Sequence, residues 1–139
     1  ERASVSQKRY REKNMEKVLE RVRLYKYSPA GIYCTLRGSA KTRKISFDLD
    51  RDEFISWYLA VDKVCVYCGT RKLNKVIRYN RRYHRFSIDR KDNMAGYTLE
   101  NITLCCKKCN SLKSNVFSYT EMLQIGNRYL KPRVANNLY

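Results

Sequence analysis

The stretch that decides the fold covers residues 87–113 and reads SIDRKDNMAGYTLENITLCCKKCNSLK. It contains a Cys-x-x-Cys pair, Cys106 and Cys109, and a second such pair, Cys65 and Cys68, lies upstream. A tight turn lets both sulfurs of a pair face one ion, and two pairs complete the tetrahedral thiolate site that zinc prefers. We therefore expect these four cysteines to bind zinc. Two disulfides or plain buried thiols are the alternatives, and disulfides require an oxidising compartment.

The expected zinc ion is structural. Four thiolates leave no open position for water, so the ion is not itself the catalyst. By joining segments about forty residues apart, it would stabilise a chain that has little apolar core to spare. Cys105 offers a Cys-x-x-x-Cys alternative to Cys106 as a ligand, although the two-residue spacing is the more usual one.

A longer pattern surrounds the second cysteine pair. Its members, in chain order, are Asn101, Cys106, Cys109, Asn110 and Lys113. This order resembles the core of HNH endonucleases, members of the His-Me finger or ββα-metal group, and the resemblance covers residues 65 to about 115. The cysteine pairs stand where zinc-bearing members of that family have theirs. The resemblance implies an α+β fold: a small zinc-stapled ββα-metal domain with flanking helices and a basic N-terminal helical arm.

The resemblance also implies a catalytic metal site. Asp89 and Asn110 would hold a divalent ion, Mg²⁺ or Mn²⁺, and Asn101 would brace the loop between them. Carboxylate and amide oxygens suit Mg²⁺, and such an ion stabilises charge on the leaving oxygen in phosphodiester hydrolysis. The alternatives are an ion pair for Asp89, and a loop brace and a helix cap for the two asparagines.

One position departs from the family pattern. Where HNH enzymes usually carry the His that deprotonates the attacking water, this chain has Arg90, and arginine cannot act as a base at neutral pH. His84, the single His, or Asp92 can replace that base. Alternatively, Arg90 binds the scissile phosphate while a water activated by the metal ion attacks. The last possibility is that the fold has lost catalysis and persists as a binding module.

Basic residues dominate the charge of the chain. There are 30 Lys and Arg against 13 Asp and Glu, which gives a formal net charge of +17. A field of this strength attracts polyanions, of which nucleic acid is the commonest, and tyrosines among the basic residues can stack on bases. The residues expected to contact a nucleic-acid backbone are Arg71, Lys72, Lys75, Arg78, Arg81, Arg82, Arg85, Lys107, Lys108 and Lys113.

Three regions are expected along the chain: a basic helical arm, a helix and strand region that packs on the core, and the HNH-like ββα domain with a C-terminal helix, at residues 1–30, 31–64 and 65–139. In the arm, apolar side chains recur at helical spacing from Met15 to Tyr25 among lysines and arginines. Its apolar stripe packs on the domain, or its basic face lies along a phosphate backbone, and both can hold at once.

Local sequence patterns predict one strand and the ends of two helices. Residues 44–49 alternate apolar with polar and predict a strand, and Asp50 predicts the start of the helix that follows. Ser118 and Glu121 predict a capping box that opens the last helix, and Pro132 is expected to end it.

Several classes of protein are disfavoured. No run of about 18 apolar residues occurs, and residues 1–4 lack the hydrophobic stretch of a signal peptide. We therefore expect no membrane partner and no secretion. The expected location is a reducing intracellular compartment, the cytoplasm or nucleoid, with the nucleus or an organelle as alternatives.

Two functions follow from these observations. The favoured one is a divalent-metal-dependent HNH-like endonuclease that hydrolyses phosphodiester bonds, with DNA favoured over RNA as the partner and the oligomeric state left open. The alternative is a non-catalytic, zinc-stabilised DNA- or RNA-binding module derived from an HNH fold, such as a ribonucleoprotein component. An enzyme should bind a divalent ion beside Asp89, whereas the module needs zinc alone.

Overall fold

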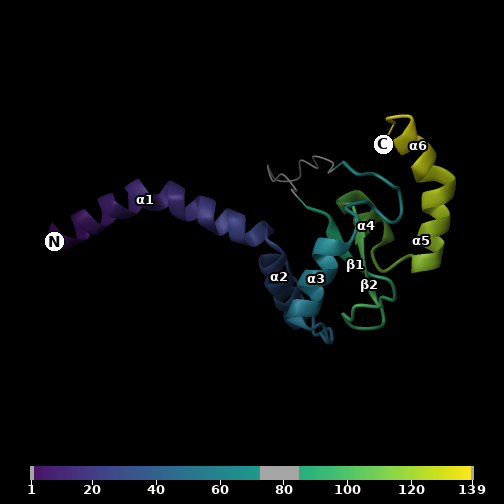
Figure 1. The fold of residues 1–139 in the computed structure, drawn as a ribbon, viewed down its shortest axis with the longest axis horizontal. Coiled ribbons are helices and arrows are strands. Elements are labelled where there is room, and N and C mark those ends of the chain that lie inside the picture. The colour runs from purple at the N-terminus through teal and green to yellow at the C-terminus, as the bar shows by residue number, and fades with distance from the viewer. Residues whose placement is uncertain (1, 73–84, 139) are drawn as a thin grey trace.

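The computed structural model describes residues 2–72 and 85–138 (Figure 1). Their elements, in chain order, are α1 (Arg2–Tyr27), α2 (Pro29–Thr42), α3 (Arg51–Ala60), β1 (Ser87–Arg90), β2 (Ile102–Cys105), α4 (Lys107–Lys113), α5 (Tyr119–Ile125), the π-helical turn η1 (Gly126–Leu130) and α6 (Lys131–Ala135). Within these two ranges, no helix combines the length and the apolar character needed to cross a membrane.

A ββα unit forms the centre of the fold. β1 pairs antiparallel with β2, with Ser87 opposite Cys105, and α4 follows β2 after one residue. That residue, Cys106, caps α4, because its Sγ accepts a hydrogen bond from the N–H of Cys109 at 3.4 Å. The fold is therefore α+β with a two-stranded sheet, as the resemblance to HNH enzymes implies.

Aromatic rings join α2 and α3 to the loop between the two strands. Ring centroids are 5.4 Å apart for Tyr33 and Phe47, 5.7 Å for Tyr33 and Phe54, and 5.7 Å for Phe47 and Tyr97. Burial of a ring such as Phe54, which is fully excluded from solvent, stabilises a fold by about 1.5–3 kcal/mol. This cluster holds α2 beside the ββα unit.

Capping side chains set the start of two helices. Asp50 Oδ1 accepts hydrogen bonds from the N–H groups of Asp52 and Glu53, at 2.8 and 3.0 Å, and begins α3. Ser118 and Glu121 form a reciprocal capping box at the start of α5. Such a cap typically contributes about 1 kcal/mol. Both helix starts agree with the sequence expectation.

The first helix extends away from the rest of the chain (Figure 1). α1 ends at Tyr27, and Ser28 then caps α2, where its Oγ accepts a hydrogen bond from the N–H of Gly31 at 3.1 Å. Apolar side chains of the expected stripe, Val18 and Val22 among them, are 51% and 57% exposed. The stripe therefore does not pack on the domain, and that interpretation of the arm is wrong.

Residues 44–49 do not form the expected strand. One bridge joins Phe47 to Tyr97. The backbone bonds beside it run from Tyr97 N–H to Ser46 O and from Asp48 N–H to Tyr97 O, both at 2.9 Å. Among the described residues, Tyr97 is the one that pairs with this segment through a β-bridge, so no strand forms. The alternation of apolar and polar residues reflects the burial of every second side chain.

The C-terminal helical path does not end at Pro132. α5 continues into η1, where the N–H of Lys131 bonds to Gly126 O, and α6 then runs through Pro132 to Ala135. Proline is tolerated in the first turn of a helix, because an N–H there needs no intrahelical partner. Because the π-helical η1 ends at Leu130, Pro132 lies in the first turn of α6, and the helical path continues through it.

Candidate functional site

The two Cys-x-x-Cys pairs converge on one point. The Sγ atoms of Cys65, Cys68, Cys106 and Cys109 all lie within 4.8 Å of one another, and all four residues are buried. The first pair sits on a turn in which Gly69 has a φ of +73°, a left-handed conformation that glycine adopts without steric cost. No disulfide joins the described cysteines, so the disulfide alternative is wrong.

The dimensions of this cluster fit zinc. Zn–S bonds of about 2.3 Å in a tetrahedron place the sulfurs about 3.8 Å apart, and the Sγ atoms of Cys68 and Cys106 are 3.8 Å apart. Cys105 is buried outside the cluster, and burial raises the pKa of its thiol. The four clustered thiols would hold zinc in a closed site, with no position left for a substrate.

Asp89, the third residue of β1, is buried in a network with two other side chains. Tyr67 Oη donates a hydrogen bond to Asp89 Oδ2 at 2.5 Å, and Lys113 Nζ lies 3.3 Å from the same oxygen. Lys113 is fully buried and also donates to Arg90 O at 2.8 Å and to Asn93 Oδ1 at 2.9 Å. The network therefore connects the first cysteine pair, β1 and α4.

This network bears on two expectations, the nucleic-acid contact of Lys113 and the metal ligand role of Asp89. We expect from the sequence that Lys113 contacts nucleic acid, but its ammonium group is buried and forms an ion pair with Asp89. The pairing is needed because an unpaired buried charge is costly. Burial, together with the hydrogen bond to Asp89, raises the pKa of the Tyr67 phenol, which keeps it a hydrogen-bond donor. A carboxylate can accept about four hydrogen bonds, so Asp89 keeps acceptor positions for a further cation.

Asn101 binds three backbone groups of the loop between β1 and β2. Its Oδ1 accepts from the N–H of Asp92 at 2.8 Å, and its Nδ2 donates to Asp92 O at 3.1 Å and to Gly96 O at 2.7 Å. These are the contacts that a bracing residue requires. The exposed carboxylate of Asp92 accepts from the N–H of Met94 at 2.8 Å, so it serves its own loop.

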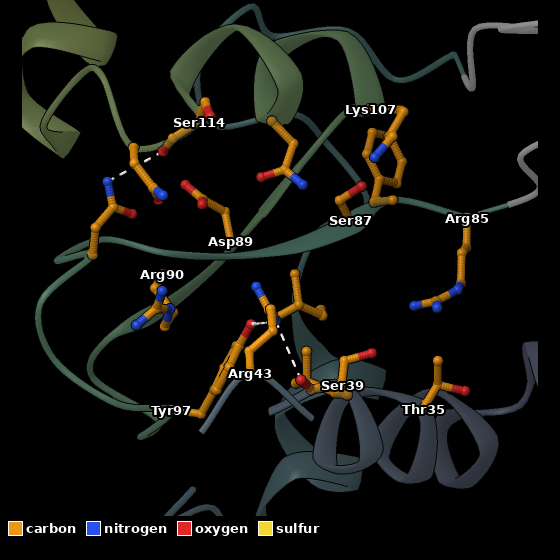
Figure 2. A pocket seen from close by; sticks show the side chains of 16 residues that line it. Thr35, Ser39, Arg43, Arg85, Ser87, Asp89, Arg90, Tyr97, Lys107 and Ser114 are labelled. Atoms are coloured by element: carbon orange, nitrogen blue, oxygen red, sulfur yellow. Dashed lines mark hydrogen bonds between the residues drawn. The ribbon is translucent and has the colours of Figure 1, made fainter. Parts of the chain in front are cut away.

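A polar pocket of about 530 Å³ opens between β1, α2 and α4 (Figure 2). Asp89 and Asn110, the expected ligands of the divalent ion, both line it, whereas Asp92 does not. The cationic side chains of its lining are Arg43, Arg85, Arg90 and Lys107. Asp89 is the one acidic residue of the described lining and already pairs with Lys113. The pocket therefore carries excess positive charge and favours an anion.

The side chains of Asp89 and Arg90 leave β1 on opposite sides, as successive strand residues do (Figure 2). Asp89 points toward α4, and Arg90 points toward Arg43 and Tyr97. Arg90 Nη1 donates to Ala95 O at 2.6 Å, and its guanidinium carbon lies 5.4 Å from the centre of the Tyr97 ring. Arg43 Nη2 donates to Tyr97 Oη at 2.7 Å. The usual position of the base thus holds a fixed cation.

The other expected residues are distributed more widely. Five of them lie outside the described residues: Lys75, Arg78, Arg81, Arg82 and His84. Arg71 is exposed, and its guanidinium donates two hydrogen bonds to Asp62, at 2.8 and 3.0 Å, which lowers the pKa of that carboxyl group. Lys72 and Lys108 are exposed. Of the described basic residues in this group, Arg85 and Lys107 are the two that line the pocket.

Sequence reasoning missed three side chains of the site. Tyr67 lies inside the first cysteine pair, and the cysteine cluster together with the backbone bond from Val66 N–H to Leu104 O places that pair near Asp89. Arg43 and Tyr97 are 54 residues apart in the chain, and Arg43 lies outside the stretch that resembles HNH enzymes. No spacing pattern connects these two residues, because only the packing of α2 brings them together.

The two cysteine pairs and the ββα unit have the relative arrangement that the resemblance implies, and the fold is HNH-like, of the zinc-knuckle type. The solved structure of the rare-cutting HNH restriction endonuclease PacI is similar to this chain, with a TM-score of 0.64 and 26% sequence identity. The match covers 77% of this chain and 80% of that chain. PacI is described as perturbing DNA. No family model and no curated protein matches the sequence.

Proposed function

We propose that the chain is a divalent-metal-dependent, HNH-like endonuclease that hydrolyses phosphodiester bonds in DNA. The observation that carries this proposal is the polar pocket lined by Asp89, Asn110 and four cationic side chains. Cationic side chains bind the phosphate backbone of nucleic acids. The likeness to a DNA-acting restriction endonuclease favours DNA over RNA as the substrate.

The donor set in the pocket fits Mg²⁺ or Mn²⁺. Mg²⁺ takes oxygen ligands and is commonly held by one or two carboxylates together with substrate phosphates. Asp89 would supply the carboxylate and Asn110 the amide oxygen, and the bound ion would stabilise the charge that develops on the leaving oxygen. Because Lys113 already neutralises Asp89, we expect substrate phosphates to complete the site and the free protein to bind the ion weakly.

The chain's own residues orient this site. Tyr67 and Lys113 fix the carboxylate of Asp89 through the contacts described above. Asn101 holds the loop that supplies the carbonyl partner of Arg90. For the base that activates water we favour His84 over Asp92, because the carboxylate of Asp92 bonds within its own loop and does not line the pocket.

One set of observations favours the non-catalytic alternative. Arg90 occupies the position of the usual base, and Asp89 is held in a buried ion pair with Lys113. A zinc-stabilised module that only binds DNA or RNA needs the charge and the fold but neither a base nor a second metal ion. The two functions differ in one property, which is ion-dependent cleavage.

Incubation of the zinc-loaded chain with supercoiled plasmid DNA and a structured RNA, in Mg²⁺, in Mn²⁺ and in EDTA, tests the proposal. The decisive variant is Asn110→Ala, because this partly exposed residue lies outside the Asp89 network. We expect ion-dependent nicking of DNA that Asn110→Ala slows by about 100-fold, the effect of removing one group that stabilises developing charge. Asp89→Ala is less informative, since it leaves the buried ammonium of Lys113 without its partner.

Ser111→Ala is the matched control, because Ser111 is exposed on the same helix and does not line the pocket. Tight binding to DNA or RNA without cleavage in any ion would reject the nuclease and support the binding module. Both functions require an affinity that falls steeply with salt. Binding that is insensitive to salt would contradict both.

A further inference from the structure

Two arginines of the pocket are held at one tyrosine ring. Arg43 donates from Nε to Ser39 O at 3.2 Å and from Nη2 to Tyr97 Oη at 2.7 Å. Arg90 donates from Nη1 to Ala95 O at 2.6 Å. Their guanidinium carbons lie 6.0 and 5.4 Å from the centre of the Tyr97 ring. The tyrosine therefore brings two cations into one part of the pocket, one from the C-terminal cap of α2 and one from β1.

These two charges have no acidic partner among the described residues. The ion pairs of the described side chains include those of Arg51 with Asp52, Arg71 with Asp62 and Lys113 with Asp89, and neither Arg43 nor Arg90 belongs to them. The oxygens that Arg43 and Arg90 contact are carbonyl and phenol oxygens, which carry no full charge. Two like charges held near one ring repel each other, and a bound anion would replace that repulsion with attraction.

The chemistry of the two side chains selects the anion. A guanidinium carries five N–H donors in a fixed plane; Arg43 uses two of them and Arg90 uses one in the hydrogen bonds described above. The remaining donors match the oxygens of a phosphate group, which arginine binds through paired hydrogen bonds. Arg90 points to the side of β1 opposite Asp89 (Figure 2), so this phosphate is not the one beside Asp89.

We propose that Arg43 and Arg90 together bind one phosphate of the DNA backbone on the α2 side of β1, next to the phosphate that is cleaved beside Asp89. This inference deepens the proposed nuclease function and rests on it. It gives α2, which lies outside the stretch resembling HNH enzymes, the task of fixing the substrate strand relative to Asp89. Tyr97, which is 3% exposed and packs on Phe47, is the positioning residue that orients Arg43.

The first test is direct binding of inorganic phosphate to the zinc-loaded chain, followed by NMR of the arginine Nε–H groups. We expect phosphate to shift the signals of Arg43 and Arg90 and to leave that of Arg37 unchanged. Arg37 is the matched control, because it is exposed on the same helix and does not line the pocket. Equal shifts at all three arginines, or none, would overturn the inference.

The second test measures DNA affinity and cleavage for Arg43→Met, Arg43→Lys and Arg37→Met. Loss of a charge-assisted hydrogen-bond pair should weaken affinity for duplex DNA roughly 10–100-fold in Arg43→Met, with a rise in KM larger than the fall in kcat. Arg43→Lys keeps the charge and should recover part of the affinity. Arg37→Met should change affinity by less than about twofold. Equal affinities for Arg43→Met and Arg37→Met would overturn the inference.

Tyr97→Phe separates binding from folding. It keeps the buried ring and removes the hydroxyl that accepts from Arg43. We expect Tyr97→Phe to lose less DNA affinity than Arg43→Met. We also expect it to keep the zinc content and the melting temperature of the wild-type chain. A wild-type chain that binds phosphate at these arginines but cuts nothing would reject the nuclease and keep the phosphate site. A chain that cuts DNA while Arg43→Met behaves as wild type would keep the nuclease and reject the site.

Discussion

Lys113 and Asp89 form an ion pair from which solvent is almost excluded. Their side chains are 0% and 9% exposed, and Nζ lies 3.3 Å from Oδ2. Removal of one partner from a buried pair leaves an uncompensated charge and costs about 3–5 kcal/mol. We therefore predict that Lys113→Met lowers the free energy of unfolding by about that amount, as measured by urea denaturation of the zinc-saturated chain.

Two further variants show whether the pair causes this loss. Lys41→Met removes an exposed lysine of α2 and should change stability by less than about 0.5 kcal/mol. The double variant Asp89→Asn/Lys113→Met removes both charges and should lose less stability than the sum of its single variants, because the two residues are coupled. The prediction fails if Lys113→Met unfolds at the same urea concentration as Lys41→Met.

The same residues show what the sequence could predict at this scale. The four clustered cysteines were found because a Cys-x-x-Cys turn is a local feature with a fixed metal geometry. Lys113 is expected from the sequence to contact nucleic acid, whereas the structure buries it, which is rare for a lysine without a charged partner. Its partners come from β1 and the following loop, and no spacing along the chain shows that they surround its ammonium group.

Among helices and turns, two glycines occupy opposite environments. A Cβ atom at Gly126, in η1, would lie 2.2 Å from the backbone oxygen of Tyr67, in the first cysteine pair. A Cβ at Gly38, inside α2, would meet no atom within 4 Å. The helical path after α5 therefore approaches the cysteine turn at a position where only glycine fits.

We predict opposite stability changes for alanine at these two positions. Gly126→Ala should lower the free energy of unfolding by about 1–3 kcal/mol, because the new methyl group displaces backbone. Gly38→Ala should raise it by about 0.5–1 kcal/mol, because alanine loses less conformational entropy in a helix. Thermal unfolding of both zinc-loaded variants measures the difference. A Gly126→Ala chain at least as stable as the wild type would show that η1 does not lie against the cysteine turn.

Helix starts were predictable for a related reason. Asp50 and Ser118 bond to backbone groups two or three residues away, so the capping signal lies within one turn of the sequence. The strand expected at 44–49 and the helix end expected at Pro132 are wrong, because each depends on backbone hydrogen bonds that the local residue pattern does not show. The first needs a partner strand, which the structure limits to Tyr97. The second is decided by the π-helical turn before Pro132.

For the molecule as a whole, the cluster of four cysteines joins segments that lie far apart in the chain. Cys65 and Cys68 precede β1, whereas Cys106 and Cys109 begin α4, and the residues between them include the strands of the ββα unit. The Tyr67 bond to Asp89 depends on this junction, because Tyr67 lies between two of the thiols. The candidate catalytic carboxylate is therefore coupled to the cysteine cluster, which would hold a structural zinc ion.

Loss of zinc should consequently abolish both the fold of this unit and its candidate site. We predict that Cys109→Ser binds less than one zinc ion per chain and lacks the cooperative thermal transition of the wild type, since a metal that binds only the folded state stabilises it by mass action. Cys34→Ser, which changes an exposed thiol outside the cluster, should keep one zinc ion and the wild-type melting temperature. Metal analysis and calorimetry on the same samples measure both quantities. A zinc-free Cys109→Ser chain that melts cooperatively at the wild-type temperature would show that the aromatic cluster of α2 and α3 suffices to hold the ββα unit.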